Sequence, residues 1–245
     1  MADRVEGRHA VEELLRSGRR VRSLRVLDSP GKDGAPLDRI VRLAVEAGVP
    51  VQRVGRRELD RDSERGAHQG VIAVAEPFRY TPLEEILRAT SGGASSLLLA
   101  LDHVTDPGNL GAVVRTADVV GAAGVIVAKD RAAEMTASAH KAAAGAAENV
   151  PVAREPNLTR ALEQCKEAGY WIAGASEHAE ALAWDAPLEG RLVIVLGSEG
   201  TGLSRLVERA CDLLVRLPVA GRVGSLNVSS AAAVLAFEWL RRQRT

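Results

Sequence analysis

The pattern of apolar and polar positions differs between the first and the second part of the chain. In the first part, apolar residues recur at helical spacing and short β-branched runs lie between them. Two Pro-containing dipeptides, Glu76-Pro77 and Thr81-Pro82, interrupt the pattern. We therefore predict a small α/β domain over residues 1–77 and a second domain over residues 78–245. The elements predicted for the first domain are helices near residues 11–15 and 40–47 and strands at 24–27, 49–54 and 71–74.

Longer apolar strands alternate with helices in the second part. Residues 97–101 form a continuous apolar run, typical of a strand that is buried on both faces of a parallel sheet. This alternation predicts an α/β fold built on a parallel sheet. Similar strands are predicted at residues 125–127, 171–173, 192–196 and 213–217. Helices are predicted at about residues 110–121, 136–147, 157–168, 203–210 and 225–242.

Composition excludes several classes of protein. With 46% hydrophobic and 26% charged residues, the 245-residue chain can bury a core and is not wholly disordered. No apolar run approaches the roughly 18 residues of a membrane span, so no membrane partner is expected. Cys165 and Cys211 are too few for a disulfide scaffold or a zinc cluster, so we expect a reducing, cytoplasmic setting, and Cys165 is interpreted as a small buried hydrophobe. His103 and His140 lack partners at metal-ligand spacing, so no metal is expected.

The net charge of the chain argues against nucleic-acid binding, but the distribution of charge along the chain does not. The 32 basic and 32 acidic residues cancel, and the seven aromatic residues are too few for a base-stacking platform. Residues 1–80, however, hold 16 basic and 13 acidic side chains. Of the basic residues 28 are Arg, the side chain suited to bidentate phosphate recognition, although codon usage in a GC-rich genome is the simpler explanation.

Three glycine-bearing polar segments each follow a predicted strand, where ligands bind in open α/β sheets. They are residues 101–111, which lead into a helix carrying Arg115, and residues 196–204 and 217–229. Glycine permits close backbone approach, so such loops are expected to wrap a nucleotide-like cofactor.

Taken singly, the polar residues of these segments have simpler structural interpretations. Asn109 suits a helix N-cap, and Glu199 suits the first turn of a helix. Ser225 and Asn227 suit caps of the last helix, and Arg115 suits a surface ion pair.

Taken in order, the segments resemble the three motifs of the SpoU/TrmH family of ribose 2′-O-methyltransferases, within the SPOUT superfamily. Motif 1 is Asp-Pro-Gly-Asn-Leu-Gly followed by Arg115, and motif 2 is Leu-Gly-Ser-Glu-Gly-Thr-Gly-Leu. Motif 3 is Leu-Pro-Val-Ala-Gly-Arg-Val-Gly-Ser-Leu-Asn-Val-Ser-Ser-Ala. Val219 and Ser230 depart from the usual family residues, Met and Val, at packing positions.

The resemblance covers almost the whole chain and is closest to the branch that methylates a guanosine of 23S ribosomal RNA. Near the start it rests on Gly-Arg-His-Ala-Val at residues 7–11 and Gly-Ala-His-Gln-Gly-Val at 66–71. Further on it rests on Lys-Asp-Arg at 129–131 and on residues 141–148. It implies an L30e-like N-terminal substrate-binding domain that selects RNA. Arg8 and His9 are candidate RNA contacts, although solvated charge on a capped helix explains them equally well.

The resemblance also implies a trefoil-knotted C-terminal domain that binds S-adenosyl-L-methionine. By analogy, backbone groups of Gly197, Leu217 and Leu226 hold its adenine and ribose, and Gly200 and Gly202 of the second segment are also assigned to cofactor binding. The family is dimeric, and each site is completed across the interface. A homodimer would place Arg115 near the partner subunit's cofactor.

The family assigns removal of the 2′-hydroxyl proton to the motif 1 arginine, here Arg115. A guanidinium is effectively always protonated, so two interpretations remain. Arg115 is either transiently neutral, or it holds a phosphate and stabilises the developing alkoxide, which we favour. Asn109, Glu199, Ser225 and Asn227 would orient Arg115, the ribose and the third loop.

Other functions make different demands on the sequence. Transfer RNA is the closest alternative substrate, and a short or missing N-terminal domain would have favoured it. A non-catalytic RNA-binding or ribosome-assembly protein predicts damaged motifs, whereas Asn109, Arg115, Glu199 and Asn227 are intact. A nicotinamide oxidoreductase predicts G-x-G-x-x-G after the first strand, where this chain has Asp-His-Val-Thr-Asp-Pro-Gly-Asn.

Overall fold

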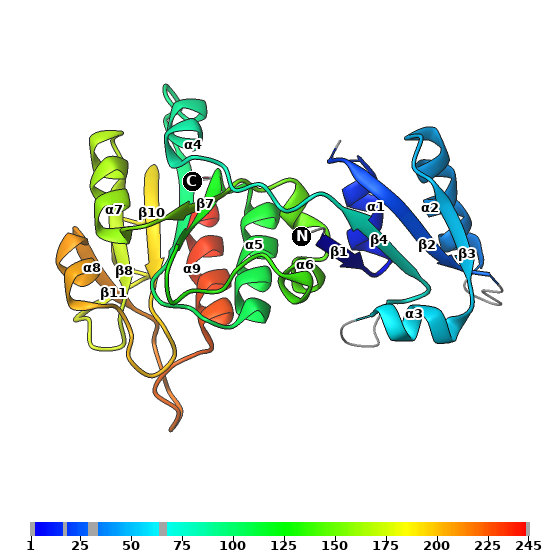
Figure 1. The fold of residues 1–245 in the computed structure, drawn as a ribbon. Helices are drawn as coiled ribbons and strands as arrows, with labels where there is room; N and C mark the ends of the chain where they lie inside the picture. The colour runs from blue at the N-terminus through cyan, green and yellow to red at the C-terminus, as the bar shows by residue number, and fades with distance from the viewer. Residues whose placement is uncertain (1–2, 17–18, 29–33, 64–67, 244–245) are drawn as a thin grey trace. The chain divides into compact units, whose positions relative to one another are not determined.

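The computed structural model describes residues 3–16, 19–28, 34–63 and 68–243, and the chain forms two compact units (Figure 1). The first unit comprises Met1–Arg79 and Met135–Asn149, and the second comprises Tyr80–Glu134 and Val150–Thr245. The sequence pattern placed one boundary between residues 77 and 78. The structure differs in that the segment Met135–Asn149 packs with the first unit.

The first unit is built on a four-stranded sheet with the order β1-β4-β2-β3. β2 pairs parallel with β3, and β4 pairs antiparallel with β1 and β2. Helices α1 and α2 pack against each other and the sheet, and the predicted stripe residues Val11, Leu14 and Ile40 are buried. The elements are β1 (Asp3–Glu6), α1 (Arg8–Arg16), β2 (Val21–Leu27), α2 (Gly34–Glu46), β3 (Val51–Val54), α3 (Arg56–Asp62) and β4 (Val71–Ala75).

A buried polar cluster attaches α6 (Ala137–Ala143) and the 3-10 helix η2 (Ala146–Glu148) to this unit. Arg19 donates hydrogen bonds to Glu148 Oε1 at 2.9 Å and to the carbonyl oxygen of Glu76 at 3.0 Å. The rings of His140 and Phe78 form a T-shaped pair, with 5.5 Å between the ring centroids. Burial, together with the charge of Arg19, lowers the pKa of His140 to about 4, so this imidazole is neutral near pH 7.

The second unit contains a seven-stranded sheet in which every pairing is parallel, with the order β7-β6-β5-β10-β8-β11-β9. β5 is buried along its whole length, as its apolar run predicts. The α/β prediction is therefore confirmed. The strands are β5 (Ser96–Leu101), β6 (Gly124–Ala128), β7 (Val152–Glu155), β8 (Trp171–Ala175), β9 (Ala181–Leu182), β10 (Arg191–Leu196) and β11 (Leu213–Arg216).

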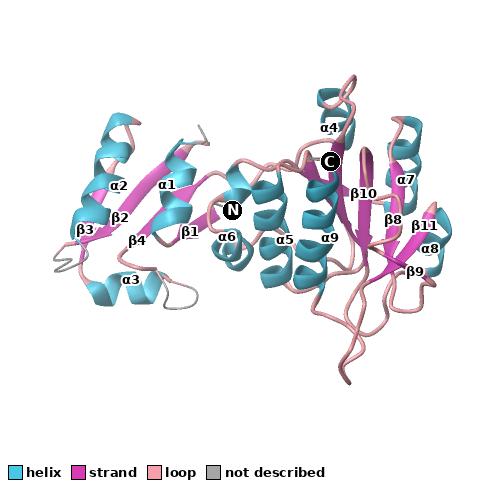
Figure 2. Cartoon of the chain, turned by 180° about the vertical axis from the view of Figure 1, so that it is seen from behind, coloured by secondary structure: helices cyan, strands magenta, loops and turns pink. Residues whose placement is uncertain are grey.

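Helices cover both faces of this sheet. α5 and α9 lie side by side on one face, in front of the strands in Figure 2. Helices α4, α7 and α8 share a buried core with the opposite face, where Cys165 is buried as predicted. Burial raises the pKa of Cys165 to about 12, so its thiol stays protonated. The helices are α4 (Leu83–Ala89), α5 (Pro107–Val120), α7 (Leu158–Glu167), α8 (Arg205–Ala210) and α9 (Val228–Arg242).

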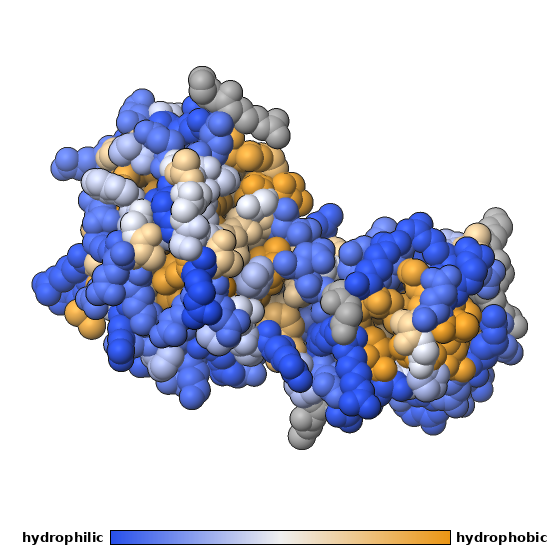
Figure 3. Space-filling model, turned by 90° about the horizontal axis from the view of Figure 1, so that it is seen from above, coloured by the Kyte–Doolittle hydropathy of each residue, from blue (hydrophilic) through white to orange (hydrophobic). Residues whose placement is uncertain are grey.

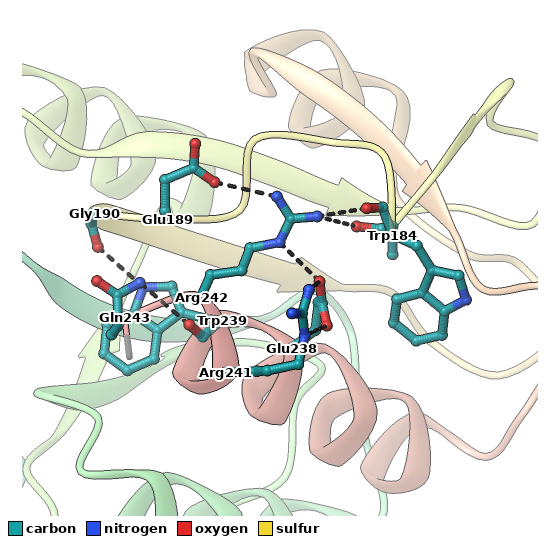
Figure 4. A network of polar contacts seen from close by, with 9 residues as sticks. Trp184, Glu189, Gly190, Glu238, Trp239, Arg241, Arg242 and Gln243 are labelled. Atoms are coloured by element: carbon teal, nitrogen blue, oxygen red, sulfur yellow. Dashed lines mark hydrogen bonds and ion pairs between the residues drawn. The ribbon is translucent and has the colours of Figure 1, made fainter. Parts of the chain in front are cut away.

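The carboxyl end of α9 is anchored to the loop before β10 (Figure 4). Arg242 donates hydrogen bonds to the carbonyl oxygen of Trp184 at 2.6 Å and to Glu238 Oε1 at 2.7 Å, and Trp239 Nε1 donates to the carbonyl oxygen of Gly190 at 3.0 Å. Hydrogen bonds from Arg241 and Arg242 hold the pKa of Glu238 at about 2, although its burial opposes ionisation. This helix therefore presents its opposite end, at Val228, in a defined position.

Within the described ranges, no helix is long and apolar enough to cross a membrane, and no group of three His, Cys, Asp or Glu side chains is arranged to hold a metal ion. Hydrophilic residues cover most of the face shown in Figure 3, with smaller apolar patches between them.

Candidate active site

The three motif loops leave the carboxyl ends of strands in the same parallel sheet. The first follows β5 and the second follows β10, and these neighbouring strands pair in register up to Leu101 and Leu196. The third loop follows β11 and runs into α9, and it extends away from the sheet in Figures 1 and 2. Parallel strands end at one edge of the sheet, so the topology brings the loops together.

One polar residue from each loop joins a single hydrogen-bonded cluster. Asn227 Nδ2 donates to Asn109 Oδ1 at 2.9 Å and to Glu199 Oε1 at 2.6 Å. Asn109 Nδ2 also donates to Glu199 Oε1, at 3.2 Å. These side chains, up to 118 positions apart in the chain, therefore form one exposed polar site.

The capping residues of the flanking helices differ in part from the sequence interpretation. Asp106, not Asn109, caps α5, and its carboxylate accepts the backbone N–H of Asn109 at 2.9 Å. This leaves the Asn109 amide to face the cluster. Asn227 does cap α9, because its Oδ1 accepts the backbone N–H of Ser229 at 2.9 Å. Glu199 lies in a turn rather than in the first turn of a helix, so that interpretation was wrong.

The second loop closes on itself tightly. The backbone groups of Ser198 and Gly202 exchange hydrogen bonds of 3.1 and 3.0 Å. Gly200 and Gly202 have φ angles of +90° and +66°, a backbone conformation that favours glycine. A β-carbon on Gly197 would lie 2.1 Å from the carbonyl carbon of Gly202, so only glycine fits there. The glycines thus build a compact turn beside Glu199.

A buried carboxylate that sequence reasoning missed ties the first loop to the second. Asp102, only 1% exposed, accepts the backbone N–H of Ser204 at 2.6 Å and contacts His103 Nδ1 at 2.6 Å. An acidic residue directly after a fully apolar strand was the available signal. Asp102 therefore joins the start of the first loop to the end of the second.

The remaining predicted residues of this unit lie outside the hydrogen-bonded cluster. Arg115 is exposed on α5 and pairs with no carboxylate among the described residues, so the surface ion pair is not found there. Ser225 is exposed and precedes the α9 cap by two positions, and α9 begins three residues later than predicted. Leu217 is half-buried, whereas Leu226 is half exposed.

In the first unit, the two N-terminal motifs come together around Arg8. Arg8 Nε donates to the carbonyl oxygen of Gln69 at 3.1 Å, and its backbone N–H donates to Gln69 Oε1 at 3.0 Å. The buried His68 accepts the backbone N–H of Gly70 at Nδ1, so its proton lies on Nε2, 3.0 Å from Asp60. His9 is exposed. Residues 66 and 67 of the second motif lie outside the described residues.

Comparison with known proteins decides the family. Residues 96–237 match the family model described as SpoU rRNA Methylase family. The chain belongs to the SpoU rRNA methylase family. Residues 4–81 match a second model, described as RNA 2′-O ribose methyltransferase substrate binding. The family predicted from the motifs is therefore confirmed for both parts of this SpoU-family chain.

Relatives of this SpoU-family chain match it along its full length. The 23S rRNA (guanosine-2′-O-)-methyltransferase RlmB of Pseudomonas aeruginosa is 44% identical, covering 99% of this chain and 97% of the relative. The Escherichia coli K12 RlmB protein is 38% identical, covering 99% and 100%. The crystal structure of an AdoMet-bound rRNA methyltransferase from Sinorhizobium meliloti superposes with a TM-score of 0.81 at 26% identity, covering 100% of this chain and 88% of that one.

Proposed function

We propose that this chain transfers a methyl group from S-adenosyl-L-methionine to the ribose 2′-hydroxyl of a guanosine in 23S ribosomal RNA. The observation that carries the proposal is the cluster of Asn109, Glu199 and Asn227, one residue from each family motif. Full-length similarity to guanosine methyltransferases of 23S rRNA supports the substrate. The intact cluster disfavours a non-catalytic RNA-binding protein.

The described residues fit the proposed cofactor. The second loop offers the backbone of Gly197, Gly200 and Gly202, which carry no side chain, and Leu226 and Val223 expose 51% and 77% of their surface in the third loop. Backbone groups of Gly197, Leu217 and Leu226 would hold the adenosine, and Gly200 and Gly202 shape the turn. When bound, the cofactor supplies a methyl group activated by a positive sulfur.

The chain's own residues then have to position the ribose and stabilise charge. The guanidinium group of Arg115 suits a phosphate contact and stabilisation of negative charge on the 2′-oxygen. Asn109, Glu199 and Asn227 hold the loops in one geometry. The ribose 2′-hydroxyl would therefore bind already oriented for methyl transfer. Ser225 lies close in sequence to this cluster and is assigned a positioning role.

We further infer a homodimer with a trefoil knot in residues 78–245 and RNA selection by residues 1–77. Val119 on α5 and Phe237 on α9 are 61% and 50% exposed, and these neighbouring helices offer an apolar face to a second copy. A dimer would bring Arg115 to the partner subunit's cofactor.

Replacing Asn227 with Asp separates helix capping from catalysis. Asp caps helices as well as Asn, so α9 should keep its stability. The new carboxylate oxygen would stand where Nδ2 now lies, 2.6 Å from Glu199 Oε1, and the two charges repel. We expect methyl transfer to fall by about ten- to a hundredfold, the range of a lost charged hydrogen bond. Unchanged kcat/KM in steady-state assays, with folding verified by urea denaturation, would contradict this role.

The substrate is tested with purified protein, isotope-labelled S-adenosyl-L-methionine and two RNAs. We expect label in unmodified 23S rRNA, at the 2′-oxygen of a guanosine, and none in unmodified transfer RNA. Label in transfer RNA alone would replace the proposed substrate with the alternative. Label in neither RNA, with cofactor binding intact, would count against the proposed activity on these naked RNAs.

A further inference from the structure

Helix α3 carries three basic and three acidic side chains, so its net formal charge is zero, but among the described residues only the acidic ones have ion-pair partners. Its three carboxylates each contact a basic side chain of a neighbouring segment. Glu58 lies 3.8 Å from Arg25 of β2, Asp62 also pairs with Arg25, and Asp60 contacts His68 at 3.0 Å. By contrast, the helix's three arginines pair with no carboxylate within the described parts of the chain. These are Arg56, Arg57 and Arg61.

Two of these arginines form an outward stripe. Leu59 is fully buried and fixes the inward side of α3. At about 100° per residue, Arg57 and Arg61 each lie about 160° from Leu59, so they are neighbours on the opposite side of the helix. Both are exposed. Like charges one turn apart destabilise a helix, so the stability of α3 does not account for this stripe.

The last turn of α3, which carries Arg61, is tied to the segments that hold Arg8, a residue already assigned to RNA contact. Ser63, directly after α3, donates to Glu6 Oε2 at 2.5 Å, and Glu6 lies two positions before Arg8. Asp60 of α3 holds His68, next to the Gln69 that binds Arg8. These contacts place the last turn of α3 near the start of α1.

We propose that Arg57 and Arg61 of α3 bind phosphates of the substrate RNA, which extends the RNA-binding surface of the first unit beyond Arg8 and His9. The proposal rests on the proposed function. The RNA backbone is the occupant because exposed guanidinium groups without carboxylate partners complement its charge and bind phosphate oxygens in pairs. Such contacts hold and orient the RNA without reading its sequence.

The test compares full-length R57A/R61A with the matched variant R16A/R39A. The control removes the same charge from two exposed arginines that are ion-paired with Glu12 on the same unit. Binding of a 23S rRNA fragment is measured by fluorescence anisotropy over a series of salt concentrations. We expect R57A/R61A to bind about tenfold more weakly at 0.1 M salt, with the salt slope reduced by about one per arginine. The control should stay within about twofold of wild type.

Further readouts separate phosphate contact from other causes. R57K/R61K should recover part of the affinity, because it restores the charge but not the planar fork, and R57A/R61A should raise KM for RNA with little change in kcat. Equal affinity of R57A/R61A and wild type, or equal losses in R57A/R61A and R16A/R39A, would overturn the proposal. A wild-type protein that binds this RNA without methylating it contradicts the proposed function instead, and the comparison of variants still decides the role of α3.

Discussion

Arg115→Ala is expected to lower methyl transfer at least about a hundredfold while S-adenosyl-L-methionine still binds. The scale is that of one group stabilising charge in a transition state. Cofactor binding should survive because Arg115 is exposed on α5 and, among the described residues, makes no hydrogen bond to the glycine turn or to Asn109, Glu199 and Asn227. Single-turnover methyl transfer and isothermal titration calorimetry measure the two effects separately.

Two further variants sharpen the role of Arg115. Asp118→Ala removes another exposed side chain from the same helix and should leave activity unchanged. Arg115→Lys keeps the charge but loses the planar fork, so intermediate activity is expected. Near-wild-type activity of Arg115→Ala would show that the role assigned to this residue is wrong. Loss of cofactor affinity in this variant would instead assign Arg115 to cofactor binding.

Gly197→Ala is expected to abolish cofactor binding and destabilise the second unit by about 2–4 kcal/mol, as overpacking does where neighbours cannot move aside. The added β-carbon would lie 2.1 Å from the Gly202 carbonyl carbon and 2.5 Å from the Leu203 nitrogen. Both contacts are with backbone, so a change of side-chain rotamer cannot relieve them, and the turn has to open. Urea denaturation and calorimetry with the cofactor report the two losses.

Gly221→Ala is the matched control for this change. Gly221 lies in the third loop, has no positive φ, and a β-carbon there meets nothing within 4 Å. We expect its stability and cofactor affinity to stay close to wild type. If Gly197→Ala binds the cofactor as tightly as Gly221→Ala does, the close packing of the second loop has no part in the site.

The parts of the fold that the sequence predicted are those with a long, regular apolar pattern. The continuous apolar runs of β5 and β10 predicted a parallel sheet, and the spacing of Val11 and Leu14 predicted a helix. The sequence pattern did not predict α3 and β7, because both are short and rich in charged residues. Tertiary contacts rather than periodicity specify these elements. The attachment of residues 135–149 to the first unit depends on Arg19 and Glu148, which are 129 positions apart.

The site was predicted as a set of motifs, but not as a set of contacts. Spacing and resemblance selected Asn109, Glu199 and Asn227, yet no local pattern indicates which amide faces which carboxylate. The Asp106 cap was missed because Asn109 is an equally good capping residue three positions later. Asp102 was missed because its partner, the backbone of Ser204, lies 102 positions away.

A map of ribose 2′-O-methyl marks tests directly whether the protein methylates a guanosine in 23S rRNA. Ribosomal and transfer RNA are compared from cells that have the protein, lack it, or carry only Arg115→Ala. We expect one guanosine mark in 23S rRNA to disappear without the protein and to stay absent with the variant, while transfer RNA is unaffected. Identical maps of both RNAs with and without the protein would contradict this activity.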